Sequence, residues 1–401
     1  MTWSGRNRPG YRLAENKQVI QPIYFFYFMS VGVSMPFFSP YLRGLGLSGR
    51  QIAMILAIVP LLNMGVPLFW AWTADRTRRH ARILSGICLG AFCGYAPLIV
   101  ARTFWTVLAS YLAFGVFSVG IGSLIDSVAI ARVRRGEDYG RIRVWGSVGY
   151  MVSAIGAGAL LTLRRGRPAD VLVPIAVASA LLATFVATLQ HHGSGEPPAT
   201  PHFVDLRALF GNRRFRLLLV LAPLHWIGCA PYNIFFGIFV RDRQFAPVVL
   251  GLALAMGVVA EMLVLLSFSR LRRRFEIETL LAIAFGGTAV RWLLMPFVTS
   301  TSAIVGLQLF HGFTFGLFWG GGIALVGECV PPALRATGQS LFVTSMLGVG
   351  NVAGYLATGW VYDRSGRVDP AFFAAAMLEV VPLTLALGAR RGRLVAERGR
   401  I

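Results

Sequence analysis

Long apolar segments alternate with short polar breaks along almost the whole chain. A helix that crosses the hydrocarbon core of a bilayer needs roughly 20 mostly apolar residues. Twelve such segments can be placed, so the pattern predicts an all-α membrane protein with twelve transmembrane helices. We expect them at about residues 18–42, 48–72, 83–101, 104–131, from 139 onward, 169–189, 215–240, 248–269, 277–298, 302–329, 335–361 and 369–389.

A break in hydrophobicity divides these segments into two sets of six. Residues 190–214 lack an apolar run of span length and contain Pro197, Pro198 and Pro201, as is typical of a linker. We therefore expect an N-terminal six-helix half over residues 1–189, a cytoplasmic linker, and a C-terminal six-helix half with a short basic tail over residues 215–401.

Composition supports a membrane protein and removes one competing function. Of the 401 residues, 56% are hydrophobic and 14% are charged, which is too apolar for a soluble domain. A net charge of +21 would suggest nucleic-acid binding in a soluble protein. With a cytoplasmic N-terminus, however, about 27 of the 38 Lys and Arg residues fall on the inner side and about 10 on the outer side. This positive-inside bias predicts a multi-pass protein of a bacterial-type inner (plasma) membrane, with both termini cytoplasmic and no nucleic-acid partner.

The sequence lacks the common signatures of an enzyme. No GxSxG, HExxH or P-loop pattern is present. The four cysteines have no CxxC spacing, and the paired His191 and His192 have no third ligand nearby. We expect no catalytic residues, no metal and no cofactor, with a proton as the coupling ion.

Three successive apolar segments each carry one ionisable residue in the interior: Glu261, Arg291 and His311. An ionised side chain at the centre of a membrane helix costs about 2.5 to 3.5 kcal/mol on insertion scales, so these residues need partners or a water-filled path. Moving Arg291 toward or away from Glu261 would change how tightly the carboxyl holds a proton, and His311 could relay it. A static, self-neutralising triad is the alternative. Glu328 and Glu379 are expected near span ends as solvated charges.

Other polar and aromatic residues are candidates for a substrate cavity. The hairpin of the fourth and fifth spans brings Asp126 near Arg143, as a cavity salt bridge or an inner-surface contact. Arg143 and Arg291 could bind a carboxylate in bidentate fashion. Hydrogen-bonding and stacking surfaces, some of which could instead be packing residues, are expected from Trp145, Tyr150, His225, Asn233, Phe315 and Trp319. Asp75 and Arg76, at the inner end of the second span, could latch neighbouring helices.

Four stretches extend the picture beyond architecture. The segments YGRIRVWGSVGY (139–150), GVVAE (257–261), AVRWLLM (289–295) and LQLFHGFTF (307–315) resemble the 3-phenylpropionate permease family of the major facilitator superfamily, which is related to lactose permease and the nucleoside/proton symporters. Two six-helix halves with a central loop are typical of this superfamily. The resemblance implies the major facilitator fold and a monomer.

The resemblance also implies residue roles. It assigns Glu261, Arg291 and His311 to proton and substrate coupling, and it matches Asp126 and Arg143 to the charge pair that binds sugar in lactose permease. Tyr150 falls where lactose permease has a stacking Trp. Thr314 stands where lactose permease carries a proton-binding Glu, which disfavours galactoside transport. The loop signature that includes Asp75 and Arg76 is incomplete, with Ala71 and Arg78 where glycines are usual.

These observations predict a secondary active transporter. We expect a proton symporter of a small organic solute, an aromatic carboxylic acid similar to phenylpropionate, that works by alternating access. The alternatives are a nucleoside or sugar proton symporter, a drug/proton antiporter, and a membrane receptor that binds without transport.

Overall fold

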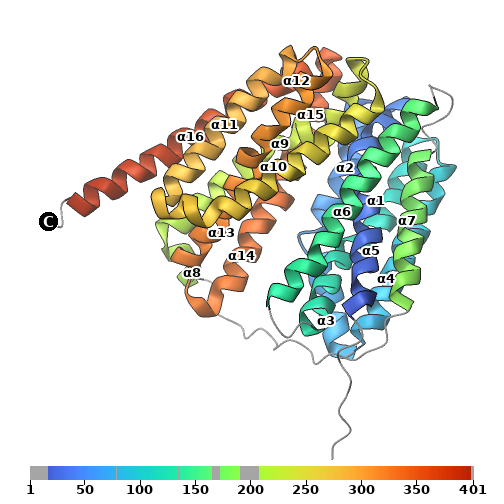
Figure 1. The fold of residues 1–401 in the computed structure, drawn as a ribbon, viewed down its shortest axis with the longest axis horizontal. Coiled ribbons are helices and arrows are strands. Elements are labelled where there is room, and N and C mark those ends of the chain that lie inside the picture. The colour runs from blue at the N-terminus through green and yellow to red at the C-terminus, as the bar shows by residue number, and fades with distance from the viewer. Residues whose placement is uncertain (1–16, 78, 133–135, 165–171, 190–206, 399–401) are drawn as a thin grey trace, which may run out of the picture.

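The fold is that of a computed structural model that describes residues 17–77, 79–132, 136–164, 172–189 and 207–398. Helices account for nearly all of these residues (Figure 1). The helices of the first half are α1 (Lys17–Gly44), α2 (Gly49–Leu62), α3 (Val66–Thr77), α4 (His80–Tyr95), α5 (Phe104–Arg132), α6 (Gly136–Leu163) and α7 (Leu172–Leu189). Those that follow are α8 (Arg207–Gly211), α9 (Arg213–Asp242), α10 (Pro247–Arg274), α11 (Ile277–Leu294), α12 (Thr301–Gly306), α13 (Phe318–Cys329), α14 (Arg335–Val343), α15 (Asn351–Ser365) and α16 (Asp369–Arg398).

The helices reproduce the predicted pattern of spans. In the part of the chain that the structure describes, eleven are long and apolar enough to cross a membrane, and the shorter apolar helix Val173–Leu189 occupies the sixth predicted place. Some spans are built from two labelled helices, such as α2 and α3 in Gly49–Thr77. Most of the predicted linker, residues 190–206, lies outside the described residues, so its role as a domain boundary stays a prediction.

The two halves lie side by side, α1 to α7 in one and α9 to α16 in the other (Figure 1). Inside the first half, α1 packs on α6 and α7, and inside the second, α11 packs on α16. A Cβ atom on Gly149 of α6 would lie 2.2 Å from the carbonyl oxygen of Phe25 in α1. The small residue therefore lets two helix backbones pack in direct contact, as small residues do between membrane helices.

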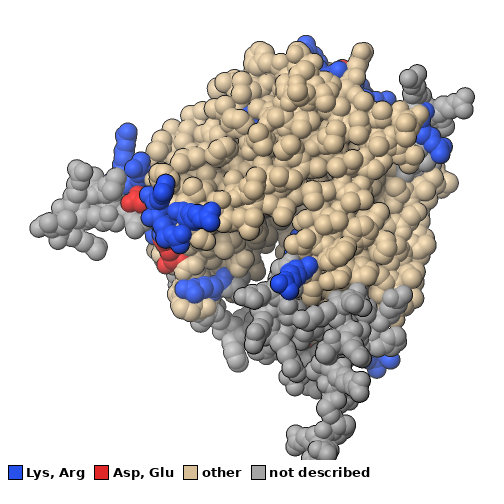
Figure 2. All heavy atoms as spheres, in the orientation of Figure 1, with Lys and Arg blue, Asp and Glu red and all other residues tan. Residues whose placement is uncertain are grey.

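The halves meet tightly at one end of the molecule. A Cβ on Gly158 of α6 would lie 2.8 Å from the carbonyl oxygen of Pro247 in α10, and one on Gly237 of α9 would lie 2.3 Å from that of Pro36 in α1. We call this region the closed end; in the predicted topology it faces outward. Toward the other end the halves diverge (Figure 1), and Figure 2 shows a hollow between them there.

Charge is distributed as expected for a protein embedded in a bilayer. On the face shown in Figure 2, Lys and Arg side chains gather near the two ends of the helices and leave a wide uncharged band between them. Exposed large hydrophobic side chains such as Leu266, Trp105 and Phe297 are 76%, 73% and 67% exposed. Lipid contact is the physical reason that such a surface is stable.

Candidate functional site

Glu261, His311 and Arg291 come together in the second half, with His311 in the middle. The Nη1 atom of Arg291 lies 3.2 Å from Nδ1 of His311, and Nε2 of His311 lies 3.8 Å from Oε2 of Glu261. Because a guanidinium can only donate, Nδ1 must accept, and the neutral imidazole carries its proton on Nε2. That proton points toward Glu261, so the imidazole stands between the two charges.

Arg291 is the buried end of this chain. Its side chain is 0% exposed. Nη2 donates to Oε1 of Gln308 at 2.5 Å, and Nη1 also donates to Oγ1 of Thr314 at 3.2 Å. The guanidinium carbon lies 4.3 Å from the ring centroid of Tyr232, a cation–π contact. Both terminal nitrogens of Arg291 are therefore occupied by protein groups, and the predicted bidentate contact of Arg291 with a carboxylate is not supported in this conformation.

An irregular helix positions His311. Between α12 and α13 the chain forms a 3₁₀ turn at Leu307–Phe310 and a π-helix at Gly312–Leu317. π-Helical turns within α-helices are frequently found at functional sites. The rings of His311 and Phe315 stack at 6.0 Å, and those of Phe315 and Trp319 at 5.6 Å. The predicted aromatic surface thus continues directly from the predicted coupling residue.

Asp126 and Arg143 both contact Tyr24 of α1 in the first half. The Tyr24 hydroxyl donates to Oδ1 of Asp126. The guanidinium of Arg143 lies 5.8 Å from the Tyr24 ring and 4.2 Å from the Phe28 ring. α6, which carries Arg143, packs across the junction of the halves against α10, which carries Glu261. The predicted pair therefore lies opposite the coupling residues, although its direct salt bridge stays a prediction.

Tyr150 and Trp145 lie on different sides of α6. The Tyr150 hydroxyl lies 3.8 Å from the sulfur of Met35 in α1. Trp145 is 43% exposed and packs edge-on against Phe25. Since each residue of a helix turns by about 100°, Trp145 lies roughly 200° around the axis from Arg143. Its predicted stacking role is therefore not supported, because it lies on the other side of the helix.

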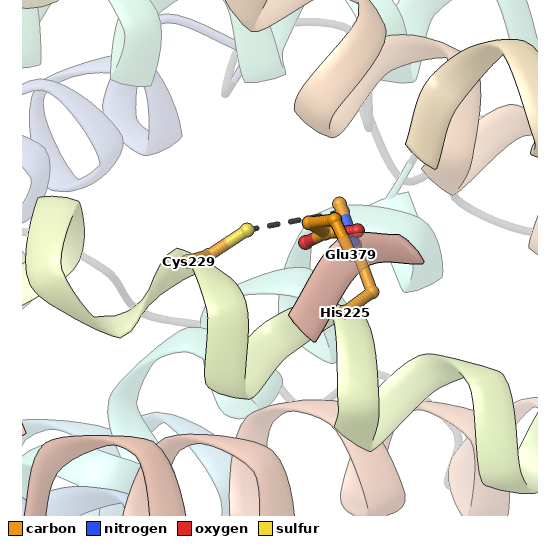
Figure 3. A group of neighbouring side chains, drawn as sticks. All are labelled: His225, Cys229 and Glu379. Atoms are coloured by element: carbon orange, nitrogen blue, oxygen red, sulfur yellow. Dashed lines mark hydrogen bonds and ion pairs between the residues drawn. The ribbon is translucent and has the colours of Figure 1, made fainter. Parts of the chain in front are cut away.

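His225 and Glu379 form a buried pair that the sequence did not predict (Figure 3). Nδ1 of His225 lies 2.8 Å from Oε1 of Glu379, and both side chains are 0% exposed. The expectation that Glu379 is a solvated charge near a span end is wrong, because α16 continues well past it and α9 covers it. The other nitrogen of His225, Nε2, lies 2.9 Å from the carbonyl oxygen of Thr314. His225 is thus occupied by protein groups, and its predicted hydrogen bond to substrate is not supported in this conformation.

Cys229 completes a cluster whose donor atoms lie within 4.8 Å of one another (Figure 3). A metal centre requires ligand atoms that converge on one point. Here the Cys229 sulfur is 3.8 Å from Nε2 of His225, whereas Glu379 contacts Nδ1 on the opposite side of the ring. The donors therefore point at different sides of the imidazole, and we interpret the cluster as a hydrogen-bonded one.

The remaining predicted residues lie elsewhere. Asn233 of α9 donates to Oδ1 of Asn351 in α15 at 3.5 Å. Asp75 of α3 pairs with His80 of α4 at 2.9 Å, so it joins the second and third spans as a latch between neighbours would. Arg76 instead lies over the ring of Trp72, 5.2 Å from its centroid.

Two residues that contact Arg291, namely Gln308 and Tyr232, were not predicted from the sequence. Gln308 could have been noticed as a polar residue one helical turn before His311 in an apolar span. For Tyr232 no signal in the sequence separates it from the many aromatic packing residues.

Several known proteins resemble this chain in sequence and fold. A family model described as the MFS_1 like family matches residues 19–373. The chain belongs to this family. Maltose permease of Geobacillus stearothermophilus is 28% identical to this chain over 403 residues. The match covers 96% of this chain and 97% of the permease. The probable 3-phenylpropionic acid transporter of Escherichia coli (strain K12) is 27% identical over 300 residues, 73% of this chain and 77% of its own. A crystal structure of the nucleoside transporter NupG matches with a TM-score of 0.81 at 18% identity and covers 93% of this chain and 98% of that one.

Family membership confirms the fold class and the resemblance read from the sequence. This MFS_1 like chain is a multi-pass membrane protein and a secondary transporter of the major facilitator superfamily, and it acts on small-molecule substrates in a lipid bilayer. Its relatives are permeases for chemically different solutes, so the family alone leaves the substrate open.

Proposed function

We propose that this transporter is a proton symporter of a small aromatic carboxylic acid. It would work by alternating access as a monomer in a bacterial-type inner membrane, with both termini in the cytoplasm. Glu261 would carry the proton, and Arg143 would bind the carboxylate of the substrate. The stacked rings of Phe315 and Trp319 would contact the aromatic part of the substrate.

A gradient of exposure along the ionisable chain carries the proposal. The Glu261 side chain is 24% exposed and that of His311 19%, whereas Arg291 behind them is 0% exposed. Glu261 is therefore the end of the chain that can exchange a proton with water. The Nε2–H of His311 points at this carboxyl and would leave it when Glu261 takes a proton, because a neutral carboxyl attracts the donor less strongly.

The position of Arg143 supports an anionic substrate. It is half-buried, lies on the helix that packs against the helix of Glu261, and has the face of Phe28 beside it. A guanidinium can hold a carboxylate through two parallel hydrogen bonds. Such a ligand would weaken the action of the Arg143 charge on Glu261, so substrate binding would favour protonation of Glu261. This linkage is the thermodynamic requirement for symport.

A nucleoside or sugar proton symporter is the second candidate. The likeness to NupG and to a maltose permease favours it. Such a protein would have the same fold and the same proton-binding carboxyl of Glu261, but it would not need a cationic side chain to bind its substrate. A drug/proton antiporter would show the opposite sign of proton flux, and a receptor would bind without transport.

Ligand-induced thermal shift on the purified protein separates these candidates. We expect small aromatic acids to raise the melting temperature, nucleosides and sugars to have no effect, and Arg143→Gln to abolish the shift. Trp145→Phe, on the other side of α6, is the matched control and should keep it. Stabilisation by nucleosides or sugars alone would overturn the substrate class, and transport of each hit into vesicles then tests symport.

A further inference from the structure

The buried pair of His225 and Glu379 lies outside the proposed path of proton and substrate, yet it touches the helix that carries His311. Both ring nitrogens of His225 are engaged, Nδ1 by the Glu379 carboxyl and Nε2 by the carbonyl oxygen of Thr314. A carbonyl oxygen can only accept, so Nε2 must carry a proton. Glu379 sits at the other nitrogen and thereby fixes the tautomer and orientation of the ring.

The acceptor of this hydrogen bond is a backbone carbonyl in the π-helix Gly312–Leu317. In a regular α-helix the Thr314 carbonyl would accept from the N–H of Phe318, four residues on. Here the Phe318 N–H donates instead to the carbonyl of Phe315. The N–H that a regular α-helix would direct at the Thr314 carbonyl thus goes elsewhere, and this carbonyl accepts a hydrogen bond from Nε2 of His225 in α9.

The side chain of the same residue, Thr314, faces the coupling site. Its Oγ1 accepts from Nη1 of Arg291 at 3.2 Å and from Oγ1 of Thr288 at 3.2 Å, and Arg291 in turn donates to His311. A change from π to α register would remove one residue from the turn and rotate Thr314 relative to Arg291. The hydrogen bond on the carbonyl and the geometry of the coupling site are therefore linked through one residue.

We propose that His225 and Glu379 are a positioning pair that holds residues 312–317 in the π-helical register and thereby keeps Thr314 and His311 on Arg291. Among the described residues, Cys229 on α9 contacts His225, and Arg291 on α11 and Tyr355 on α15 are the further titratable groups that influence Cys229. In a dry interior, a His–carboxylate pair that shares one extra proton is neutral, and either loss or gain of a proton leaves an uncompensated buried charge. The pair keeps its proton throughout the transport cycle. Only the consequence for coupling rests on the proposed function; the register itself does not.

The test compares three variants by structure determination. In His225→Leu/Glu379→Leu both polar partners are removed together, so neither is left buried and unpaired. In this variant we expect residues 312–317 to form α-helical hydrogen bonds and the hydrogen bond between Thr314 Oγ1 and Arg291 to be lost. Glu379→Gln should preserve the π-helix, because its amide can donate to Nδ1 while Nε2–H stays on Thr314. Cys229→Ala, which removes a neighbour without a role in the register, is the matched control. A π-helix that persists unchanged in the double variant overturns the proposal.

A second measurement uses the wild-type protein and does not depend on how the double variant folds. In protein with ¹⁵N-labelled histidine, the resonance that moves in Glu379→Gln identifies His225. We expect its Nε2 to be protonated at every pH at which the protein is folded, and an unprotonated Nε2 would contradict the proposal. Neither readout involves substrate or proton flux, so a failure of the symport proposal would leave both results interpretable.

Discussion

The carboxylate of Asp363 in α15 caps the first turn of α2 in the other half: Oδ1 accepts from the backbone N–H of Gly49 at 2.5 Å. Its Oδ2 accepts from the backbone N–H and from Nε of Arg50, each at 3.0 Å. A carboxylate at a helix N-terminus satisfies otherwise unpaired N–H groups and interacts favourably with the helix dipole. Because this contact joins the two halves at the closed end, it must break when that end opens.

Asp363→Ala should therefore shift the protein toward the conformation that is open at this end. Loss of a capping side chain costs about 0.5 to 2 kcal/mol, so we expect a change of about 2- to 30-fold in the ratio of the two conformations. Distances between spin labels at Val100 and Thr301, on exposed positions near this end, would report it. Arg50→Ala, which keeps the cap on Gly49, should have a smaller effect; equal distance distributions for Asp363→Ala and wild type would refute this role.

Two glycines on α6 offer a matched test of the close approach between the halves. A Cβ on Gly158 would meet the carbonyl oxygen of Pro247 at 2.8 Å, whereas one on Gly156 would have no atom within 4 Å. Gly158→Val should oppose closure by about 1 to 3 kcal/mol, the usual cost of overpacking. Gly156→Val should behave as wild type. The same spin-label pair measures both, and similar shifts in the two variants would show that contact at Gly158 does not control closure.

Removal of the Arg143 guanidinium should weaken the binding of an aromatic acid. A hydrogen bond to a charged group contributes about 1.5 to 3 kcal/mol, so Arg143→Gln should lower the affinity about 10- to 150-fold. Arg143→Lys keeps the charge but loses bidentate geometry, so its affinity should lie between those of wild type and Arg143→Gln. Calorimetric titration of purified protein with an acid found by thermal shift gives these numbers. Unchanged affinity in Arg143→Gln would show that another residue binds the carboxylate.

Sequence and structure agree best where one-dimensional signals are strong. Glu261, Arg291 and His311 stand out because ionisable residues are rare in apolar runs, and the structure brings all three together. Trp145 is a case in which the sequence held more than the prediction used. It follows Arg143 by two residues, so helical periodicity alone places it roughly 200° around α6 from Arg143, whereas Tyr150, seven residues after Arg143, returns to the same side.

The buried pair shows the other limit of the sequence. Glu379 lies near the middle of the predicted span 369–389, so its burial could have been expected from position alone. Its partner His225 is 154 residues away, and nothing in the sequence relates the two. The π-helix that receives the second hydrogen bond of His225 likewise depends on packing between helices, which local residue preferences do not encode.

Proton movement in vesicles that contain the purified protein tests the central claim most directly. With an inward gradient of an aromatic acid and a pH-sensitive dye inside, we predict acidification of the interior by wild type beyond that of protein-free vesicles. Glu261→Gln should abolish this excess. Glu328→Gln, whose carboxylate pairs with Arg214 and Arg272 away from the site, should keep it. Absence of excess acidification in wild type, or equal acidification in Glu261→Gln, would contradict proton symport through Glu261.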